Sequence, residues 1–157
     1  MDMAGDPDIV SDCLVPLNAT KVGGTVFTFT VGAPLPTAFT VSKVSAAEFP
    51  ARIGQSVSCA VLQFPAGTTN PPHTHPRSTE YDSLTHYRVE GLVHFQYRVD
   101  AQEPALAISA FVSASAGTVS IPTTLFAAGI DDNILAKAIK TGVATILASR
   151  SGLAPTP

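Results

Sequence analysis

Hydrophobic and polar residues alternate with a period of two over several short stretches of the chain. The clearest stretch is 25–31, TVFTFTV, in which Val26, Thr28 and Thr30 alternate with Phe27, Phe29 and Val31. Successive side chains of a strand point to opposite faces of a sheet, so this pattern is typical of strands with one buried face. The same pattern recurs at 38–44, 56–64, 92–99, 105–112 and 118–121. Glycine, proline and serine separate these stretches, which predicts an antiparallel sandwich or barrel with strands over about 24–126.

One segment near the C-terminus has a different period. Between 131 and 148, apolar residues recur every three or four positions, which predicts helices. Asp131 and Asp132 suit a helix N-terminus, and Gly142 is placed to divide the segment into two helices. The tail 151–157 is expected to fray. Since the chain contains no internal repeat and no linker-like stretch, residues 1–157 are predicted to form a single domain.

Composition narrows the classes of partner. Only 13% of the residues are charged, the net charge is −3, and no basic cluster occurs, which argues against nucleic acid. The longest uncharged run, 104–130, contains Gly117, Pro122 and many hydroxyl residues, so it predicts buried strands and turns rather than a membrane span. The first twelve residues have neither a basic region nor an apolar run, so no signal peptide is predicted in this chain.

Two cysteines, Cys13 and Cys59, are too few to define a disulfide framework. Cys59 lies within an alternating apolar run and is predicted to be a buried structural thiol. The triplet from Asn18 to Thr20 is a glycosylation sequon, which matters only if the protein is secreted.

Candidate chemistry is concentrated at 70–80, NPPHTHPRSTE. In a strand, residues i and i+2 face the same way, so His73 and His75 would aim two imidazoles at one point. Pro76 turns the chain directly afterwards, and Glu80 can then return on the next segment. Two imidazoles and one carboxylate make up most of a mononuclear metal site. The alternative interpretation is a proline-stiffened loop that contains histidines by coincidence.

His94 is a candidate fourth ligand. It lies within an expected strand with apolar neighbours on both sides, where a neutral imidazole needs a partner and a metal ion would supply one. The alternative is an ordinary hydrogen-bonded sheet histidine. His86 has no neighbours that suggest a role and is predicted to be a surface residue. Spacing alone leaves the metal site and its alternative open.

The sequence resembles the germins and germin-like proteins, the plant branch of the cupin superfamily. Residues 64–80, FPAGTTNPPHTHPRSTE, resemble the first sequence box of that family, and 91–97, GLVHFQY, resemble the second. Residues 5–13 are similar to the family's mature N-terminus, while 104–126 and 131–140 are similar to its last strands and C-terminal helices. The resemblance therefore covers nearly the whole chain.

This resemblance implies a jelly-roll barrel with one manganese ion bound by His73, His75, Glu80 and His94. It also implies a small-molecule substrate, with oxalate oxidase or superoxide dismutase activity in some members and no assigned activity in many. A secreted, apoplastic or cell-wall glycoprotein, glycosylated at Asn18 and used in plant defence, is the expected context. The expected assembly is a homo-oligomer, a trimer or a hexamer.

The chain departs from the family pattern between Glu80 and Gly91. We estimate that roughly two dozen residues, enough for three or four strands of ~5–6 residues, are absent there. The expected fold is therefore an incomplete cupin-type jelly-roll barrel with a C-terminal helical segment. Cys13 matches the first of two family cysteines but the second has no counterpart, so no disulfide is expected.

Three hypotheses follow from the sequence and its resemblance to the germins. The first is a germin-like, manganese-binding extracellular plant protein, in which any catalysis would be metal-centred oxidation of a small acid or superoxide. The second is a non-enzymatic cell-wall or storage-like cupin. The third is a shortened, inactive variant that does not fold alone.

Overall fold

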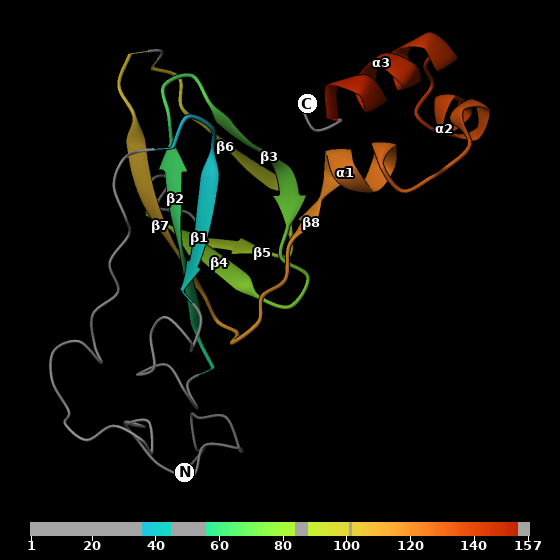
Figure 1. Ribbon diagram of the computed structural model, residues 1–157. Helices are drawn as coiled ribbons and strands as arrows, with labels where there is room; N and C mark the ends of the chain where they lie inside the picture. Colours follow the sequence, from blue (N-terminus) through green and yellow to red (C-terminus); the bar gives the residue numbers. More distant parts are fainter. Residues whose placement is uncertain (1–35, 45–55, 84–87, 101, 154–157) are drawn as a thin grey trace, which may run out of the picture.

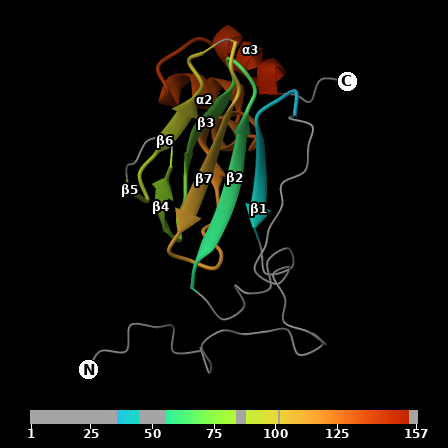
Figure 2. The same cartoon turned by 90° about the vertical axis from the view of Figure 1, so that its left-hand side faces the viewer.

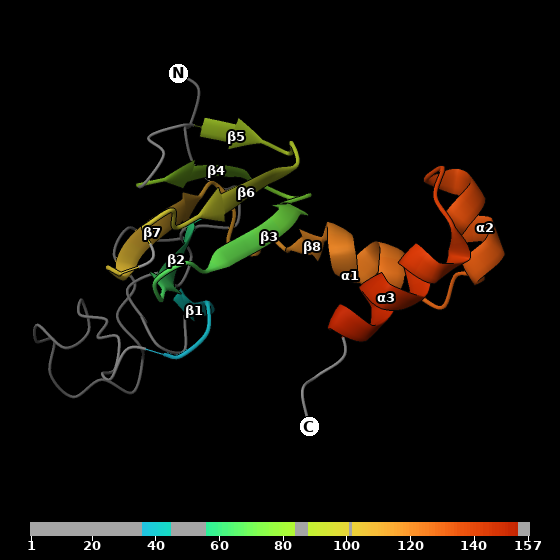
Figure 3. The ribbon, with the colours of Figure 1, turned by 90° about the horizontal axis from the view of Figure 1, so that it is seen from above.

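The computed structural model of this protein describes residues 36–44, 56–83, 88–100 and 102–153. Two antiparallel sheets face each other, and three helices extend to one side of them (Figures 1 and 3). The first sheet has the order β1 (Thr40–Val44), β2 (Ser58–Phe64), β7 (Ala105–Phe111), β4 (Thr79–Asp82) and β5 (Arg88–Glu90). The second sheet has the order β6 (His94–Tyr97), β3 (Thr69–Thr74) and β8 (Val119–Ser120).

The fold class predicted from the sequence is confirmed. The described part of the chain is mostly antiparallel sheet with a few helices, and its strands do not close into a barrel (Figure 2). The predicted strands at 38–44, 56–64 and 105–112 correspond to β1, β2 and β7. The stretch 25–31 lies outside the described residues, as do Cys13, Asn18 and His86.

The main core lies on the inner face of the first sheet. Leu62 of β2 pairs with Ala107 of β7, and both side chains are buried, whereas Leu106 and Ile108 on the opposite face of β7 are half exposed. This alternation is what a period-two sequence produces when one face of a sheet is covered. The core cluster comprises Ala60, Leu62, Phe64, Ala107, Phe111 and Ala116.

The prediction for Cys59 was wrong. Its thiol is free and only partly buried, and the residue lines a surface pocket. Cys59 alternates with Ala60 and Leu62 along β2, so its side chain faces away from the core that those residues form.

The C-terminal region forms three helices, α1 (Ile121–Phe126), α2 (Asp132–Ala138) and α3 (Val143–Leu153). The predicted division near Gly142 is confirmed, and Asp131 caps α2 by accepting hydrogen bonds from the backbone N–H groups of Asn133 and Ile134. Two expectations were wrong. Strands were expected to continue to about residue 126, but β8 ends at Ser120 and α1 begins at Ile121. Fraying was expected from 151, but α3 continues to Leu153.

The helices have a small core of their own, formed by Leu135, Ala136 and Ile146. They are joined to the sheets through α1, which follows β8 directly and packs against β3. No helix among the described residues is long and apolar enough to span a membrane.

Candidate metal centre

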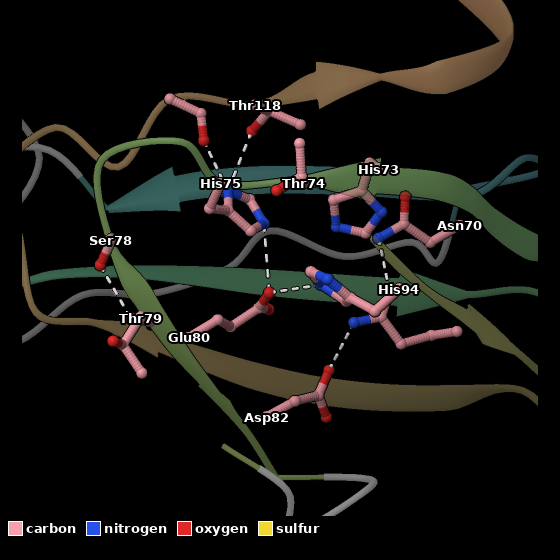
Figure 4. A network of polar contacts seen from close by, with 12 residues as sticks. Asn70, His73, Thr74, His75, Ser78, Thr79, Glu80, Asp82, His94 and Thr118 are labelled. Atoms are coloured by element: carbon pink, nitrogen blue, oxygen red, sulfur yellow. Dashed lines mark hydrogen bonds and ion pairs between the residues drawn. The ribbon is translucent and has the colours of Figure 1, made fainter. Parts of the chain in front are cut away.

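Strands β3, β4 and β6 bring the four predicted ligands together between the two sheets. His73 of β3 is the register partner of His94, the first residue of β6. His75 follows directly after β3, and Glu80 points from β4 in the opposite sheet toward the histidines (Figure 4). The i, i+2 spacing therefore places both imidazoles of the HTH motif on one side of the strand, as predicted.

The four side chains form one compact cluster. Each of the four residues offers one possible ligand atom, and these four atoms all lie within 4.8 Å of one another. Oε2 of Glu80 is 2.7 Å from Nε2 of His94 and 3.1 Å from Nε2 of His75. His73, His75 and Glu80 are buried, and His94 is partly buried. The sequence thus identified the members of this cluster, while their binding of a metal ion stays a prediction.

Each imidazole is oriented by a backbone carbonyl. Nδ1 of His73 lies 2.8 Å from the Pro71 oxygen, and Nδ1 of His94 lies 3.0 Å from the Leu92 oxygen. Nδ1 of His75 lies 2.5 Å from the oxygen of Gly117. A carbonyl only accepts, so each Nδ1 carries the proton and donates, and in a neutral ring Nε2 keeps its lone pair. In metal-binding histidines, the ring nitrogen that does not face the ion usually donates such a hydrogen bond.

The electrostatics of the cluster favour an ionised carboxylate. Burial raises the pKa of Glu80, but the hydrogen bonds from His75 and His94 outweigh it, and the pKa lies well below its ordinary value. The pKa of His94 is raised, chiefly by its hydrogen bond to Glu80 and against the effect of burial. The pKa of His73 is lowered, chiefly by burial.

These protonation states point to a cation. Because Nδ1 of His75 and of His94 donates to a carbonyl, the Nε2 of a neutral ring would present a lone pair to the oxygen of Glu80. Two acceptors at such distances repel each other unless a proton or a metal ion lies between them. The donor set of three imidazoles and a carboxylate therefore fits a divalent ion, which would replace the protons.

A cavity of about 50 Å³ adjoins the cluster and is lined by Asn70, His73, His75, Glu80 and Ser109, among others. A larger pocket of about 230 Å³ is lined by residues of β1, β2 and the turn 114–118, together with His75. Both share His75, Phe111 and Thr118 in their walls.

Three polar residues near the cluster were missed by the sequence argument. Asp82 follows Glu80 by two positions on β4, Gln96 follows His94 by two positions on β6, and Asn70 lies on β3. The two-residue spacing that selected His73 and His75 applies equally to Asp82 and Gln96, so the signal was present in the sequence.

Comparison with solved structures shows which class of protein has this fold and this arrangement of side chains. The chain is similar to a recombinant oxalate oxidase in complex with glycolate, with a TM-score of 0.71 and 26% sequence identity over 95% of this chain and 98% of that chain. This is the cupin fold. No known family model matches the sequence.

Curated relatives narrow the class to a family. The chain is 44% identical to germin-like protein 9-3 of Oryza sativa subsp. japonica, covering 98% of this chain and 88% of the relative. It is 43% identical to putative germin-like protein 9-2 of the same species, covering 98% and 87%. The chain belongs to the germin-like proteins. The first alignment spans 190 positions, more than this chain's 157 residues, so the relative has residues without a counterpart here. Their location after Glu80 stays a prediction.

Proposed function

We propose that this germin-like protein binds one manganese ion through His73, His75, Glu80 and His94. The observation that carries this proposal is the convergence of four ligand atoms while every Nδ1 proton is engaged by a backbone carbonyl. Imidazole and carboxylate ligands suit several divalent ions, and manganese is the one that the germin resemblance implies. Such an ion, when bound, supplies a Lewis acid with positions open to substrate and a redox-capable centre.

The proposed activity is metal-dependent oxidation of a small acid, of the oxalate oxidase type, or the conversion of superoxide. A 50 Å³ cavity holds only a molecule of few atoms, since one water in the liquid occupies ~30 Å³. Lys43 and Arg77 line the larger pocket and favour an anion there. Glu80 remains anionic, and the Phe111 ring packs against the His75 ring with 4.7 Å between the ring centroids. The similarity to an oxalate oxidase with glycolate supports this substrate class.

The proposed context is a secreted protein of the apoplast and cell wall, glycosylated at Asn18, that serves in plant defence as one domain within a homo-oligomer. Membership of the germin-like family supports this context. Association is also supported by the outer face of the first sheet, where Tyr81, Leu106, Ile108 and Val112 are all about half exposed or more.

Metal analysis tests the ligand assignment. We expect purified protein loaded with Mn²⁺ to retain one ion per chain, and the variants His75→Ala and His94→Ala to lose it. The matched control is His86→Ala, which removes the chain's one remaining histidine and should leave the manganese content unchanged. Equal manganese in all four proteins would overturn the assignment.

The same preparations separate enzyme from non-enzymatic cupin. If the proposal is correct, the manganese-loaded parent releases hydrogen peroxide from oxalate or accelerates the loss of superoxide, and both ligand variants do neither. A parent that holds a full complement of manganese and shows neither activity would instead support the non-enzymatic cell-wall or storage role.

A further inference from the structure

A chain of three polar side chains runs beside the candidate ligands, from one sheet to the other. Gln96 donates through Nε2 to Oδ2 of Asp82 at 2.9 Å, and Asn70 donates through Nδ2 to Oε1 of Gln96 at 2.6 Å. Asp82 and Gln96 are 2% and 5% exposed, so the contact between them is shielded from water, whereas the contact of Gln96 with Asn70 is partly buried. Asp82 and Asn70 lie at the two ends of this chain, beside His94 (Figure 4).

The carboxylate of Asp82 sets the direction of the whole chain. An ionised carboxylate can only accept, so the group of Gln96 that faces it must be the NH2 group. Oε1 of Gln96 then faces Asn70, and Asn70 must present its own NH2 group in return. A carboxamide without such a constraint can turn over and exchange its donor for its acceptor. Asp82 therefore determines which way the Asn70 amide points.

The oriented end of the chain lies at the metal centre. Asn70 lines the 50 Å³ cavity together with His73, His75 and Glu80. Ser109 lines the same cavity, is fully buried, and contributes a side-chain hydrogen bond to Glu80. The cavity wall therefore carries polar groups from Asn70, Ser109 and Glu80, which suits a small polar ligand.

Asp82 also adds a second buried negative charge beside the four ligands. A buried carboxylate costs free energy unless it is hydrogen-bonded and balanced by positive charge. A divalent ion at the four ligands would balance both Glu80 and Asp82.

We propose that Asp82 is a positioning residue of the metal centre, which acts through Gln96 to hold the Asn70 amide toward the ligand cavity and strengthens cation binding by its charge. This inference rests on the proposed metal site. It assigns to Asp82 two measurable effects, one on the affinity for the ion and one on the surroundings of the bound ion.

The test compares Asp82→Asn with the parent protein, using Mn²⁺ as the probe in isothermal titration and electron paramagnetic resonance. Asparagine keeps the shape of the side chain but removes the charge and the fixed direction. Because outer-shell partners of metal ligands typically contribute 10–100-fold, we expect at least a ~10-fold loss of affinity and a changed Mn²⁺ zero-field splitting. The control Glu103→Gln makes the same change of net charge at an exposed site and should alter neither.

A double variant, Asp82→Asn with Gln96→Glu, separates orientation from general damage. It moves the carboxylate to position 96, where it still accepts from Nδ2 of Asn70, so the parent spectrum and most of the affinity should return. Unchanged affinity and spectrum in a folded Asp82→Asn protein would overturn the proposal. If the single variant does not fold, a double variant that regains neither folding nor affinity would overturn it too. A parent that binds no Mn²⁺ would overturn both the metal site and this inference. A parent that binds Mn²⁺, with an Asp82→Asn variant that binds it equally well and gives the same spectrum, would overturn this inference alone.

Discussion

At the scale of single residues, the contact between His94 and Glu80 couples protonation to folding. The pKa of His94 is raised from an ordinary value of 6.5, so its contribution to stability is complete below that pH and is lost as the pH rises through the raised value. The pKa of Glu80 is lowered from 4.5, so its contribution is present above pH 4.5 and is lost as the pH falls through the lowered value. In the metal-free protein the pair therefore stabilises the fold most between these limits.

We expect His94→Gln to lose more unfolding free energy at about pH 5.5 than at pH 8 in the presence of a chelator, because only the protonated imidazole gains from Glu80. Urea denaturation of parent and variant at both pH values measures the difference. Manganese reverses the trend, since the ion needs the unprotonated Nε2, so the affinity of the parent for Mn²⁺ should rise over the same interval. A loss of stability that is equal at both pH values would contradict this account of the pair.

At the scale of elements, the turn after β7 orients one candidate ligand, His75. The carbonyl of Gly117 accepts from Nδ1 of His75, and Gly117 adopts a positive φ of 70°. A Cβ at this position would lie 2.8 Å from Nη2 of Arg77, whose Nε donates to the Ser115 carbonyl at 2.8 Å. The turn, Arg77 and His75 therefore behave as one unit, although they are far apart in sequence.

Gly117→Ala should disturb this unit, and Gly129→Ala is its matched control. Both glycines have a positive φ, 70° and 73°, but a Cβ at Gly129 meets nothing within 4 Å. Each substitution should cost the ~1–2 kcal/mol of a left-handed residue with a side chain, measured by urea unfolding. Only Gly117→Ala should also weaken Mn²⁺ binding, by about tenfold, because it displaces the carbonyl that orients His75. Equal Mn²⁺ affinities in the two variants would show that the turn does not support the site.

The elements also show what sequence could and could not predict. Strands β2 and β7 were predictable because the inner face of their sheet is covered, so buried residues such as Leu62 and Ala107 recur at every second position. Helix α1 was not predictable. Ser120 is both the last residue of β8 and the N-cap of α1, and a cap inside an uncharged stretch does not change the hydrophobic period that a sequence argument uses. The four residues of the candidate metal centre were selected by spacing together with family resemblance. The Gly117 carbonyl was not, since a backbone acceptor 42 positions from His75 leaves no mark on residue type.

At the scale of the whole molecule, two hydrophobic cores are joined by one short helix. The sheet core and the helical core contain separate residues, and α1 connects them by packing against both β3 and α3. Within the helical part, an ion pair also links α2 to α3, with 2.9 Å between Oδ1 of Asp132 and Nε of Arg150. The proposed single domain requires that the two cores unfold together.

Substitution of the α2 cap tests this requirement. Asp131→Ala should cost ~1 kcal/mol, the usual loss for a helix N-cap. The three tyrosines, at 81, 87 and 97, all precede the helices in sequence, so their fluorescence does not report on the helical residues themselves. If the chain is one cooperative unit, thermal unfolding followed by tyrosine fluorescence and by helical circular dichroism should shift to lower temperature together. A shift of the helical signal alone would show two independent units.

The pairing of His73 with His94 has a consequence for how the chain selects its native arrangement. The rings of both residues are oriented by carbonyls two positions earlier in their own segments, which fixes each ring relative to its own backbone but not relative to the other strand. What brings them together is the alignment of β6 with β3. A slip by one residue would turn His94 to the outer face and dismantle the cluster. A cation that requires all four ligands would therefore bind only the chain with the correct strand register. Its binding would shift the equilibrium from misaligned pairings toward that register, so the ion would help to select the native alignment of the sheet.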